Sequence, residues 1–255
     1  MSRFGFTNEN IYGQKKRSLF ILNEINHHGK NRAPLKILDF GCGTGEMITF
    51  PIAEKGYTIT GMDLDQKSIQ RANKINPFAN ASFICKNILN YPTESRFDVI
   101  ICSEVLEHLE NPEIILLALT KLLNSDGIMI VTIPNGIGPF EFEQFLLKCL
   151  LTVFPSLKDT KKKMMLKEIE KRGIMMTENL DSEHIQFFTL KKFQKLIGSC
   201  NLIIEKSEKS CFIAGPFSNQ IIKHFPVIID INVNKITRFI PFRLCSGWYF
   251  IARKK

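Results

Sequence analysis

The chain has 255 residues, of which 44% are hydrophobic, enough to build one α/β domain with a sizeable core. No apolar run reaches the length of a membrane span, the N-terminus lacks the apolar core of a signal peptide, and the seven cysteines contain no C-x-x-C pair. These features argue against a membrane-spanning protein, a disulfide framework and a structural zinc site, so we expect a cytoplasmic protein. The net charge of +9 fits either an acidic partner or, as we favour, an ordinary lysine-rich surface.

The first predicted element is an amphipathic helix over residues 8–28, in which apolar side chains recur at helical spacing between basic ones. Gly29 is a fitting end for this helix. We therefore expect residues 1–30 to form an N-terminal helical segment.

A glycine-rich stretch over residues 38–47 follows. It comes after an apolar, extended-looking segment and leads into another apolar one, so it predicts a strand, a tight turn and the start of a helix. The glycines at every second position, Gly41, Gly43 and Gly45, leave no Cβ where the backbone must turn sharply and approach a ligand. A helix N-terminus behind the turn offers free N–H groups to a carboxylate or a phosphate.

The spacing of these glycines discriminates between ligands. A dinucleotide fingerprint, G-x-G-x-x-G, requires its third glycine where this chain has Glu46. Asp39, directly before the turn, would repel a pyrophosphate and suits a cationic or amino-bearing ligand. The pattern therefore disfavours a nicotinamide oxidoreductase.

The stretch resembles the first motif of class I S-adenosylmethionine-dependent methyltransferases, D/E-x-G-x-G-x-G. Asp39, Gly41, Gly43 and Gly45 match that motif residue for residue. The resemblance implies S-adenosylmethionine as the cofactor, held by this turn, which includes Cys42.

The next two predicted strands supply further candidates for this cofactor. The strand over residues 56–63 ends in Asp63, about twenty positions beyond the glycines, where a carboxylate can accept hydrogen bonds from both ribose hydroxyls. Leu64 beside it can line the adenine, and Asp65 is expected to cap a helix over residues 66–73. After a third strand over residues 81–85, Asn87 and Ile88 are expected to flank the adenine. Methyltransferases often have Asp at the position of Asn87.

The fourth strand, residues 97–102, is a continuous apolar run and leads into Ser-Glu-Val-Leu-Glu-His-Leu. Ser103 is expected to reach the methionine end of the cofactor. On a helix, Glu104, Glu107 and His108 would stand at i, i+3 and i+4, on one face. His108 is then a candidate general base that takes a proton from a hydroxyl, with Glu104 beside it.

The Glu-Val-Leu-Glu-His segment resembles that of ubiquinone-biosynthesis O-methyltransferases. It is also similar to the E-x-x-E-H element of small-RNA 2′-O-methyltransferases, in which these side chains bind a divalent metal together with a later histidine. His184 is the candidate for that histidine here. The resemblance implies that Glu104, Glu107, His108 and His184 hold Mg²⁺ or a similar ion. The alternative is that these side chains act through hydrogen bonds alone.

The rest of the chain predicts three more strands and two insertions. An apolar helix over 112–123, a turn at 125–127 and a fifth strand over 128–133 lead to Pro-Asn-Gly-Ile-Gly-Pro-Phe-Glu at 134–141. This segment and His-Ile-Gln-Phe-Phe-Thr at 184–189 resemble a group of bacterial methyltransferases of largely unassigned substrate. Residues 136–183 are expected to form a helical insertion with a basic cluster at 158–172, and the resemblance implies that this insertion is a lid over the substrate pocket. The prediction is completed by a helix capped by Thr189, a sixth strand over 201–205, a second insertion over 213–246 and a last strand over 247–253. The resemblance implies that the last strand is antiparallel.

Strand and helix alternate throughout, which predicts a doubly wound α/β fold in a single domain over residues 1–255. The resemblance implies a Rossmann-like, mostly parallel, seven-stranded sheet with helical insertions. We expect methylation of a hydroxyl on a small molecule, a glycan or glycolipid, or a quinone precursor. An RNA 2′-O-methyltransferase, with nucleic acid as a less favoured partner, and a non-catalytic nucleoside-binding module are the alternatives. Peripheral membrane contact stays open for the second insertion, and the sequence does not determine the oligomeric state.

Overall fold

The computed structural model describes residues 13–30, 34–92, 94, 96–156, 184–222 and 224–255. The first twelve residues of the expected N-terminal segment lie outside the described residues, as do residues 157–183 of the expected lid, which include the basic cluster at 158–172.

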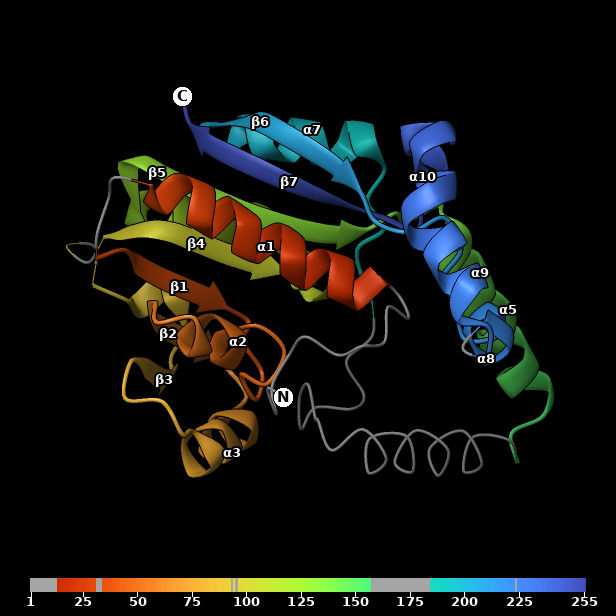
Figure 1. Cartoon of the computed structure of the whole chain (residues 1–255), viewed down its shortest axis with the longest axis horizontal. Helices are drawn as coiled ribbons and strands as arrows, with labels where there is room; N and C mark the ends of the chain where they lie inside the picture. Colours follow the sequence, from red (N-terminus) through yellow and green to blue (C-terminus); the bar gives the residue numbers. More distant parts are fainter. Residues whose placement is uncertain (1–12, 31–33, 93, 95, 157–183, 223) are drawn as a thin grey trace.

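A seven-stranded sheet with the order β3-β2-β1-β4-β5-β7-β6 forms the centre of the molecule (Figure 1). The pairs β1–β2, β2–β3, β1–β4 and β4–β5 are parallel, whereas β7 runs antiparallel to both β5 and β6. The predicted doubly wound, mostly parallel sheet is therefore confirmed. The strands are β1 (Lys36–Phe40), β2 (Thr58–Asp63), β3 (Ala81–Cys85), β4 (Phe97–Ser103), β5 (Leu123–Pro134), β6 (Leu202–Lys209) and β7 (Gly247–Lys254).

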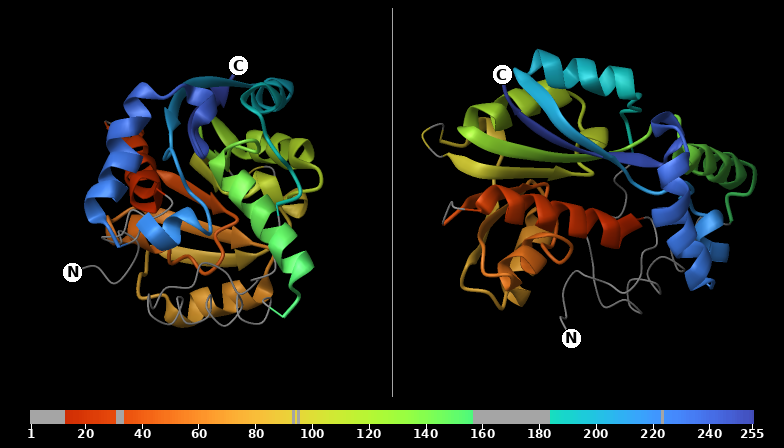
Figure 2. Two further views of the ribbon diagram at one scale, coloured as in Figure 1. Left: turned by 90° about the vertical axis from the view of Figure 1, so that its right-hand side faces the viewer. Right: turned by 45° about the horizontal axis from the view of Figure 1, so that its top comes forward.

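Helices cover both faces of the sheet, as the alternation of buried side chains on the strands requires. On one face, Ile37, Val99 and Ile130 pack against α1 (Gln14–Gly29), α2 (Thr49–Glu54) and α3 (Gln66–Ile75). On the other face, Leu38 and Ile100 pack against α4 (Pro112–Leu122) and α7 (Leu190–Ser199). In Figure 2 (right), α1 and α7 lie on opposite sides of the sheet.

Most of the predicted elements occur close to their expected bounds. Asp65 accepts the backbone N–H groups of Lys67 and Ser68 at the start of α3, and Thr189 accepts that of Lys192 at the start of α7, so both predicted caps are confirmed. The turn expected at 125–127 is absorbed into β5, whose pairing with β4 shifts register between Phe97 and Val99.

Two helical connections stand together at the carboxyl ends of the parallel strands (Figures 1 and 2). The first contains α5 (Pro139–Val153); the second contains α8 (Ser218–Ile222), α9 (Pro226–Asp230), the π-helical turn η4 (Ile231–Lys235), α10 (Ile236–Phe239) and η5 (Phe242–Leu244). Glu143 of α5 joins them, because its Oε2 accepts the backbone N–H groups of Phe217 and Ser218 at 2.9 Å each. Within the described residues, no helix combines the length and the apolar character needed to cross a lipid bilayer.

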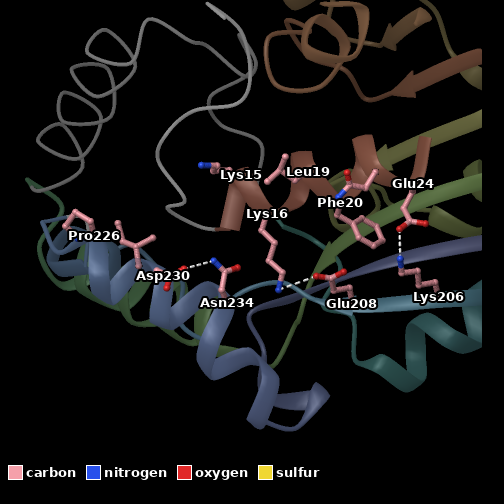
Figure 3. Close-up of a pocket in the computed structure, with 12 residues that line it drawn as sticks. Lys15, Lys16, Leu19, Phe20, Glu24, Lys206, Glu208, Pro226, Asp230 and Asn234 are labelled. Atoms are coloured by element: carbon pink, nitrogen blue, oxygen red, sulfur yellow. Dashed lines mark hydrogen bonds and ion pairs between the residues drawn. The ribbon is translucent and has the colours of Figure 1, made fainter. Parts of the chain in front are cut away.

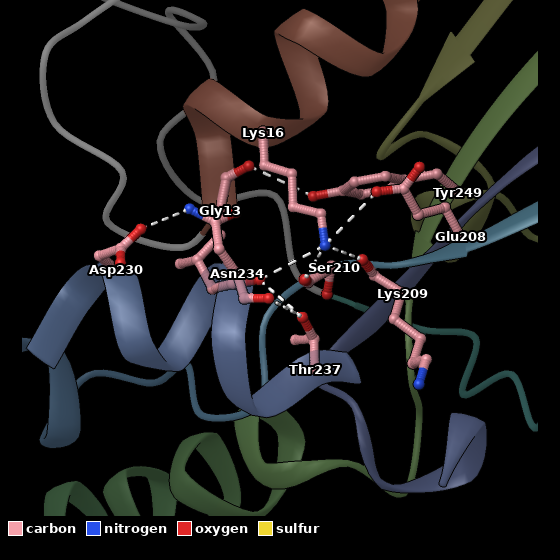
Figure 4. A network of polar contacts seen from close by, with 10 residues as sticks. Gly13, Lys16, Glu208, Lys209, Ser210, Asp230, Asn234, Thr237 and Tyr249 are labelled. Atoms are coloured by element: carbon pink, nitrogen blue, oxygen red, sulfur yellow. Dashed lines mark hydrogen bonds and ion pairs between the residues drawn. The ribbon is translucent and has the colours of Figure 1, made fainter. Parts of the chain in front are cut away.

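The second connection is also tied to α1. The ammonium of Lys16 donates to the carbonyl oxygens of Lys209 at 2.6 Å, Ser210 at 3.0 Å and Val233 at 3.4 Å, and lies 3.5 Å from the Glu208 carboxylate (Figure 4). A cavity of about 530 Å³ lies beside this network, between α1, β6 and α9 (Figure 3). Its lining mixes apolar side chains with both charges and includes no residue of the glycine turn.

Candidate active site

The predicted glycine turn joins β1 to α2, and its backbone requires glycine. Gly41, Gly43 and Gly45 have φ angles of 74°, 55° and 76°, in the left-handed region that residues with a Cβ rarely adopt. A Cβ on Gly45 would also lie 2.5 Å from the ring of Phe83, and one on Gly41 would collide with Val105. All three glycines are therefore needed for the conformation of the turn, and Gly41 and Gly45 are needed for space as well.

Asp63 fixes the turn at the carboxyl end of β2. Its Oδ2 accepts the backbone N–H of Gly43 at 2.8 Å, and its Oδ1 accepts that of Asp65 at 2.9 Å. Each carboxylate oxygen keeps a second lone pair for a ligand hydroxyl. Leu64, the next residue, leaves 64% of its surface exposed and can pack against a ligand.

Asp39 lies beneath the turn and is only 1% exposed. Its Oδ2 accepts a hydrogen bond of 2.6 Å from the Thr49 hydroxyl, on the first residue of α2. Burial, with a smaller contribution from the negative charge of Asp63, raises the pKa of Asp39 from its ordinary value of 3.8 to about 7. This carboxyl therefore loses its proton near neutral pH.

The other residues expected around the cofactor differ in their surroundings. Asn87 is exposed at the edge of the sheet, and its Oδ1 accepts the backbone N–H of Leu89 at 3.0 Å. Ile88 is 4% exposed, with its side chain in the core, and Cys42 is 9% exposed and packs in the core of the α1 face. The Ser103 hydroxyl lies 2.8 Å from that of Thr132.

The segment after β4 differs from the predicted helix. Only Leu106–His108 forms a 3₁₀ turn, η3, and Glu104 has a left-handed backbone with φ 55°. The expectation that Glu104, Glu107 and His108 share one helical face is therefore wrong. The carboxylate of Glu104 instead accepts the Thr132 hydroxyl at 2.8 Å and lies 3.4 Å from the guanidinium of Arg17 on α1.

Glu107 is fully buried inside η3. Among the described residues, neither of its carboxyl oxygens has a hydrogen-bond partner, although the Nε2 atom of His108 lies 3.9 Å from Oε1. Desolvation, and then the charge of Glu104, hold the pKa of Glu107 well above its ordinary value. A buried carboxyl in this state is costly unless a cation or a donor meets it.

His184 is brought to the same place by the chain that precedes α7. The backbone N–H groups of Ile185 and Gln186 both donate to the Glu107 carbonyl at 2.9 Å. As a result, the His184 ring stands edge-on to the His108 ring, with centroids 4.8 Å apart. One ligand atom each from Glu107, His108 and His184 lie within 4.8 Å of one another, which suits a divalent cation or a relay of protons. Glu104 is not part of this group.

Three side chains around this group were not identified from the sequence. Oε1 of Glu141 forms a hydrogen bond of 2.6 Å with Nδ1 of His184. Thr132 donates a hydrogen bond to Glu104, and Arg17 forms an ion pair with it. For Glu141, the signal in the sequence is an acidic residue in the first turn of a helix that begins at Pro139. For Thr132 and Arg17 the contacts depend on strand pairing and helix docking, which motif spacing does not report.

Known methyltransferases match a large part of this chain. A family model described as a methyltransferase domain matches residues 14–206. Proteins named ubiquinone biosynthesis O-methyltransferase are among the curated relatives. The one from Rickettsia canadensis is 33% identical over 119 residues, which are 46% of this chain and 50% of that protein. The one from Rickettsia akari is 31% identical over 119 residues, 46% of this chain and 47% of that protein. The chain thus spans about half the length of the curated relatives it matches.

Solved methyltransferase structures share the fold. The plantazolicin methyltransferase BpumL in complex with SAH superposes with a TM-score of 0.55 at 20% identity, over 98% of this chain and 87% of that one. PKMT2 from Rickettsia typhi in complex with AdoHcy superposes with a TM-score of 0.58 at 18% identity, over 87% of this chain and 49% of that one. With the family model covering most of its length, the chain belongs to the methyltransferase domain family, as its glycine motif predicted.

Proposed function

We propose that this protein is an S-adenosylmethionine-dependent methyltransferase that methylates a hydroxyl oxygen. The observation that carries the proposal is the anchoring of the Gly41–Gly45 turn on the Asp63 carboxylate, at the carboxyl edge of the sheet. Open parallel sheets bind nucleosides at this edge. The curated relatives named O-methyltransferases support the same reaction class.

The residues around the turn fit this cofactor. Asp63 has lone pairs left for ribose hydroxyls, and exposed Leu64 can cover an adenine. Burial raises the pKa of Asp39, and a positively charged ligand above the turn would lower it again by favouring the ionised carboxylate. Such a ligand would therefore give the buried carboxyl a role in binding. When bound, S-adenosylmethionine supplies a methyl group activated by a sulfonium. The chain's own task is to align the acceptor with that methyl and to exclude water.

On the acceptor side, His108 is the residue proposed to take the hydroxyl proton. It adjoins the buried Glu107 carboxyl, with 3.9 Å between Nε2 of His108 and Oε1 of Glu107. A proton taken up by the imidazole would favour the ionised carboxylate, and the two opposite charges would then stabilise each other. In a second arrangement, in which His108 is a metal ligand instead of the base, Glu107, His108 and His184 fit a divalent cation such as Mg²⁺, because their ligand atoms converge and the Glu107 oxygens lack hydrogen-bond partners among the described residues. Such a cation would polarise the acceptor hydroxyl. Glu104, engaged by Thr132 and Arg17, is a supporting residue in this arrangement.

The acceptor that we favour is an aromatic or otherwise apolar small molecule with a hydroxyl, as a quinone precursor has. Large apolar side chains are exposed on both segments that flank His184 and Glu141: Ile137 leaves 72% of its surface exposed, Phe142 63%, Ile185 49% and Phe187 48%. They can hold an apolar acceptor, or rest on a membrane that contains one. All seven cysteines are free thiols, which favours a reaction in the cytoplasm.

Binding and turnover test this proposal in two steps. Calorimetry should show binding of S-adenosylmethionine and no binding of NADPH; NADPH binding alone would refute the proposal. Transfer of a radiolabelled methyl group should then be measured with a prenylated catechol and with small RNA as acceptors. Transfer to the catechol supports the favoured acceptor class, whereas transfer to the RNA 2′-hydroxyl identifies the alternative.

The base and the metal are tested separately from the cofactor. His108→Gln should lower kcat by a factor of about 10² or more, since general base catalysis contributes 10²–10⁴-fold, and should leave cofactor binding intact. Full turnover by this variant would dismiss the base. Chelation and His184→Ala should both reduce turnover if a cation is used. If neither chelation nor His184→Ala changes turnover, the metal is dismissed and His108 is the base without one.

A further inference from the structure

Two segments that carry recognisable motifs, residues 134–141 and 184–189, lie directly against each other. The backbone N–H of Gly136 donates to the Phe188 carbonyl at 2.8 Å. A Cβ at Gly136 would lie only 2.5 Å from the carbonyl carbon of Phe187, so the close approach requires glycine there. This contact joins the start of α5 to the chain that carries His184.

The same contact brings the carboxylate of Glu141 to the His184 ring. Their Oε1 and Nδ1 atoms are 2.6 Å apart, and Glu141 is only 9% exposed. Glu141 stands in the first turn of α5, where the helix dipole favours a negative charge. The rings of Phe140 and His108 pack against the His184 ring with centroids 5.7 Å and 4.8 Å away, so the ring orientation is constrained by packing and by this hydrogen bond together.

We propose that Glu141 is the positioning residue for His184. Its carboxylate accepts the proton on Nδ1 and thereby leaves Nε2 as the nitrogen that acts on an ion or on the acceptor. Histidine ligands in metal sites commonly donate their other ring N–H to a carboxylate, which fixes the tautomer and raises the basicity of the ligand nitrogen. Among the described residues, the group able to hold an ion consists of Glu107, His108 and His184, so Glu141 acts through His184. This inference rests on the proposed function of that group.

The experiment compares Glu141→Met, which removes the acceptor, with Glu141→Gln, which keeps an amide oxygen that can accept from Nδ1. Glu113→Met is the matched control, because Glu113 is an exposed glutamate in the first turn of α4, which also begins at a proline. The wild type, these three variants and His184→Gln are prepared with ¹⁵N-labelled histidine. The chain has five histidines, so His184 can be assigned by comparison with His184→Gln.

Two readouts are measured besides turnover. In long-range ¹H–¹⁵N spectra at pH 8.5, the wild type and Glu113→Met should carry a proton on Nδ1 of His184, and Glu141→Met should lose this preference. In Mn²⁺ titrations followed by electron paramagnetic resonance, Glu141→Met should weaken binding about 10-fold or more, and Glu141→Gln less. The kcat value should fall in the same order, while KM for S-adenosylmethionine stays constant.

An unchanged His184 spectrum with unchanged Mn²⁺ affinity in Glu141→Met would overturn the positioning role. If the Met variant does not fold, the Gln variant decides through Mn²⁺ affinity, because its neutral amide oxygen should support His184 less than the carboxylate does; an affinity equal to that of the wild type would then overturn the positioning role. If the wild type binds no Mn²⁺, the spectrum alone decides. A wild type that transfers no methyl group refutes the proposed function, while the spectrum still reports on Glu141 and His184.

Discussion

Replacing Asp39 by Asn should make the free protein more stable at neutral and alkaline pH. The folded chain keeps the Asp39 proton up to about pH 7, because burial raises its pKa from 3.8, whereas the unfolded chain releases it near pH 4. The folded state therefore binds more protons than the unfolded state between these values. Stability from this group is fully present below pH 4 and is lost as the pH rises through 7.

The size of the effect follows from the two pKa values. At about 1.4 kcal/mol per pH unit, the rise from 3.8 to about 7 corresponds to about 4 kcal/mol. The asparagine side chain has nearly the same shape as that of Asp39, and its amide oxygen can still accept the Thr49 hydroxyl. We expect the free energies of unfolding of variant and wild type to differ little at pH 4. The difference in favour of the variant should then grow by about 3 kcal/mol from pH 5 to pH 8.

Urea unfolding of both proteins at pH 4, 5, 6, 7 and 8, without ligand, measures this difference. The two proteins share every other titratable group, so the difference between them at each pH reports on Asp39. A constant difference between wild type and Asp39→Asn from pH 5 to pH 8 would refute the reasoning. Under the proposed function, the same variant should bind S-adenosylmethionine more weakly than the wild type at pH 8.

Three further substitutions test other parts of the structure. Gly45→Ala should lower the free energy of unfolding by about 1–3 kcal/mol and abolish cofactor binding, because position 45 has a left-handed φ and an added Cβ would collide with Phe83. A variant that binds the cofactor and melts like the wild type would contradict this. Lys16→Met should lower the free energy of unfolding by about 1–3 kcal/mol in chemical denaturation, since three carbonyl oxygens lose an ammonium donor, and an unchanged midpoint would argue against that network. Thr189→Ala should cost about 1 kcal/mol through the lost cap on the Lys192 N–H, and Thr189→Ser should recover most of it.

The fold could be predicted almost completely, because its signals are local. Continuous apolar runs such as residues 97–102 mark strands buried on both faces, and capping residues such as Asp65 and Thr189 mark helix starts. The length of β5 could not be predicted. Its first residues, 123–127, contain a Ser-Asp-Gly turn signal, but pairing with β4 across a register shift holds them in the sheet.

The acceptor side of the candidate site could be predicted only in part. The group of Glu107, His108 and His184 follows from motif resemblance, and it meets in space. The helical spacing assumed for Glu104 fails, because its backbone N–H donates to the Thr132 carbonyl and its φ is positive, so the chain turns before η3 can begin. Such a turn depends on the neighbouring strand and leaves no periodic signal in the sequence.

Two carboxyl groups at the carboxyl edge of this sheet share one physical property. Burial raises the pKa of Asp39 to about 7 and that of Glu107 well above its ordinary value, so the charged form of each is unfavourable in the free chain. Buried acids of this kind contribute little to stability on their own. A positively charged ligand would reverse the balance at each site, and under the proposed function one such ligand meets the turn above Asp39 and another meets Glu107. Binding at either site should then favour loss of the carboxyl proton and stabilise the fold more at pH 8 than at pH 5. The pH dependence of ligand-induced stabilisation therefore measures how far ligand binding ionises each carboxyl group.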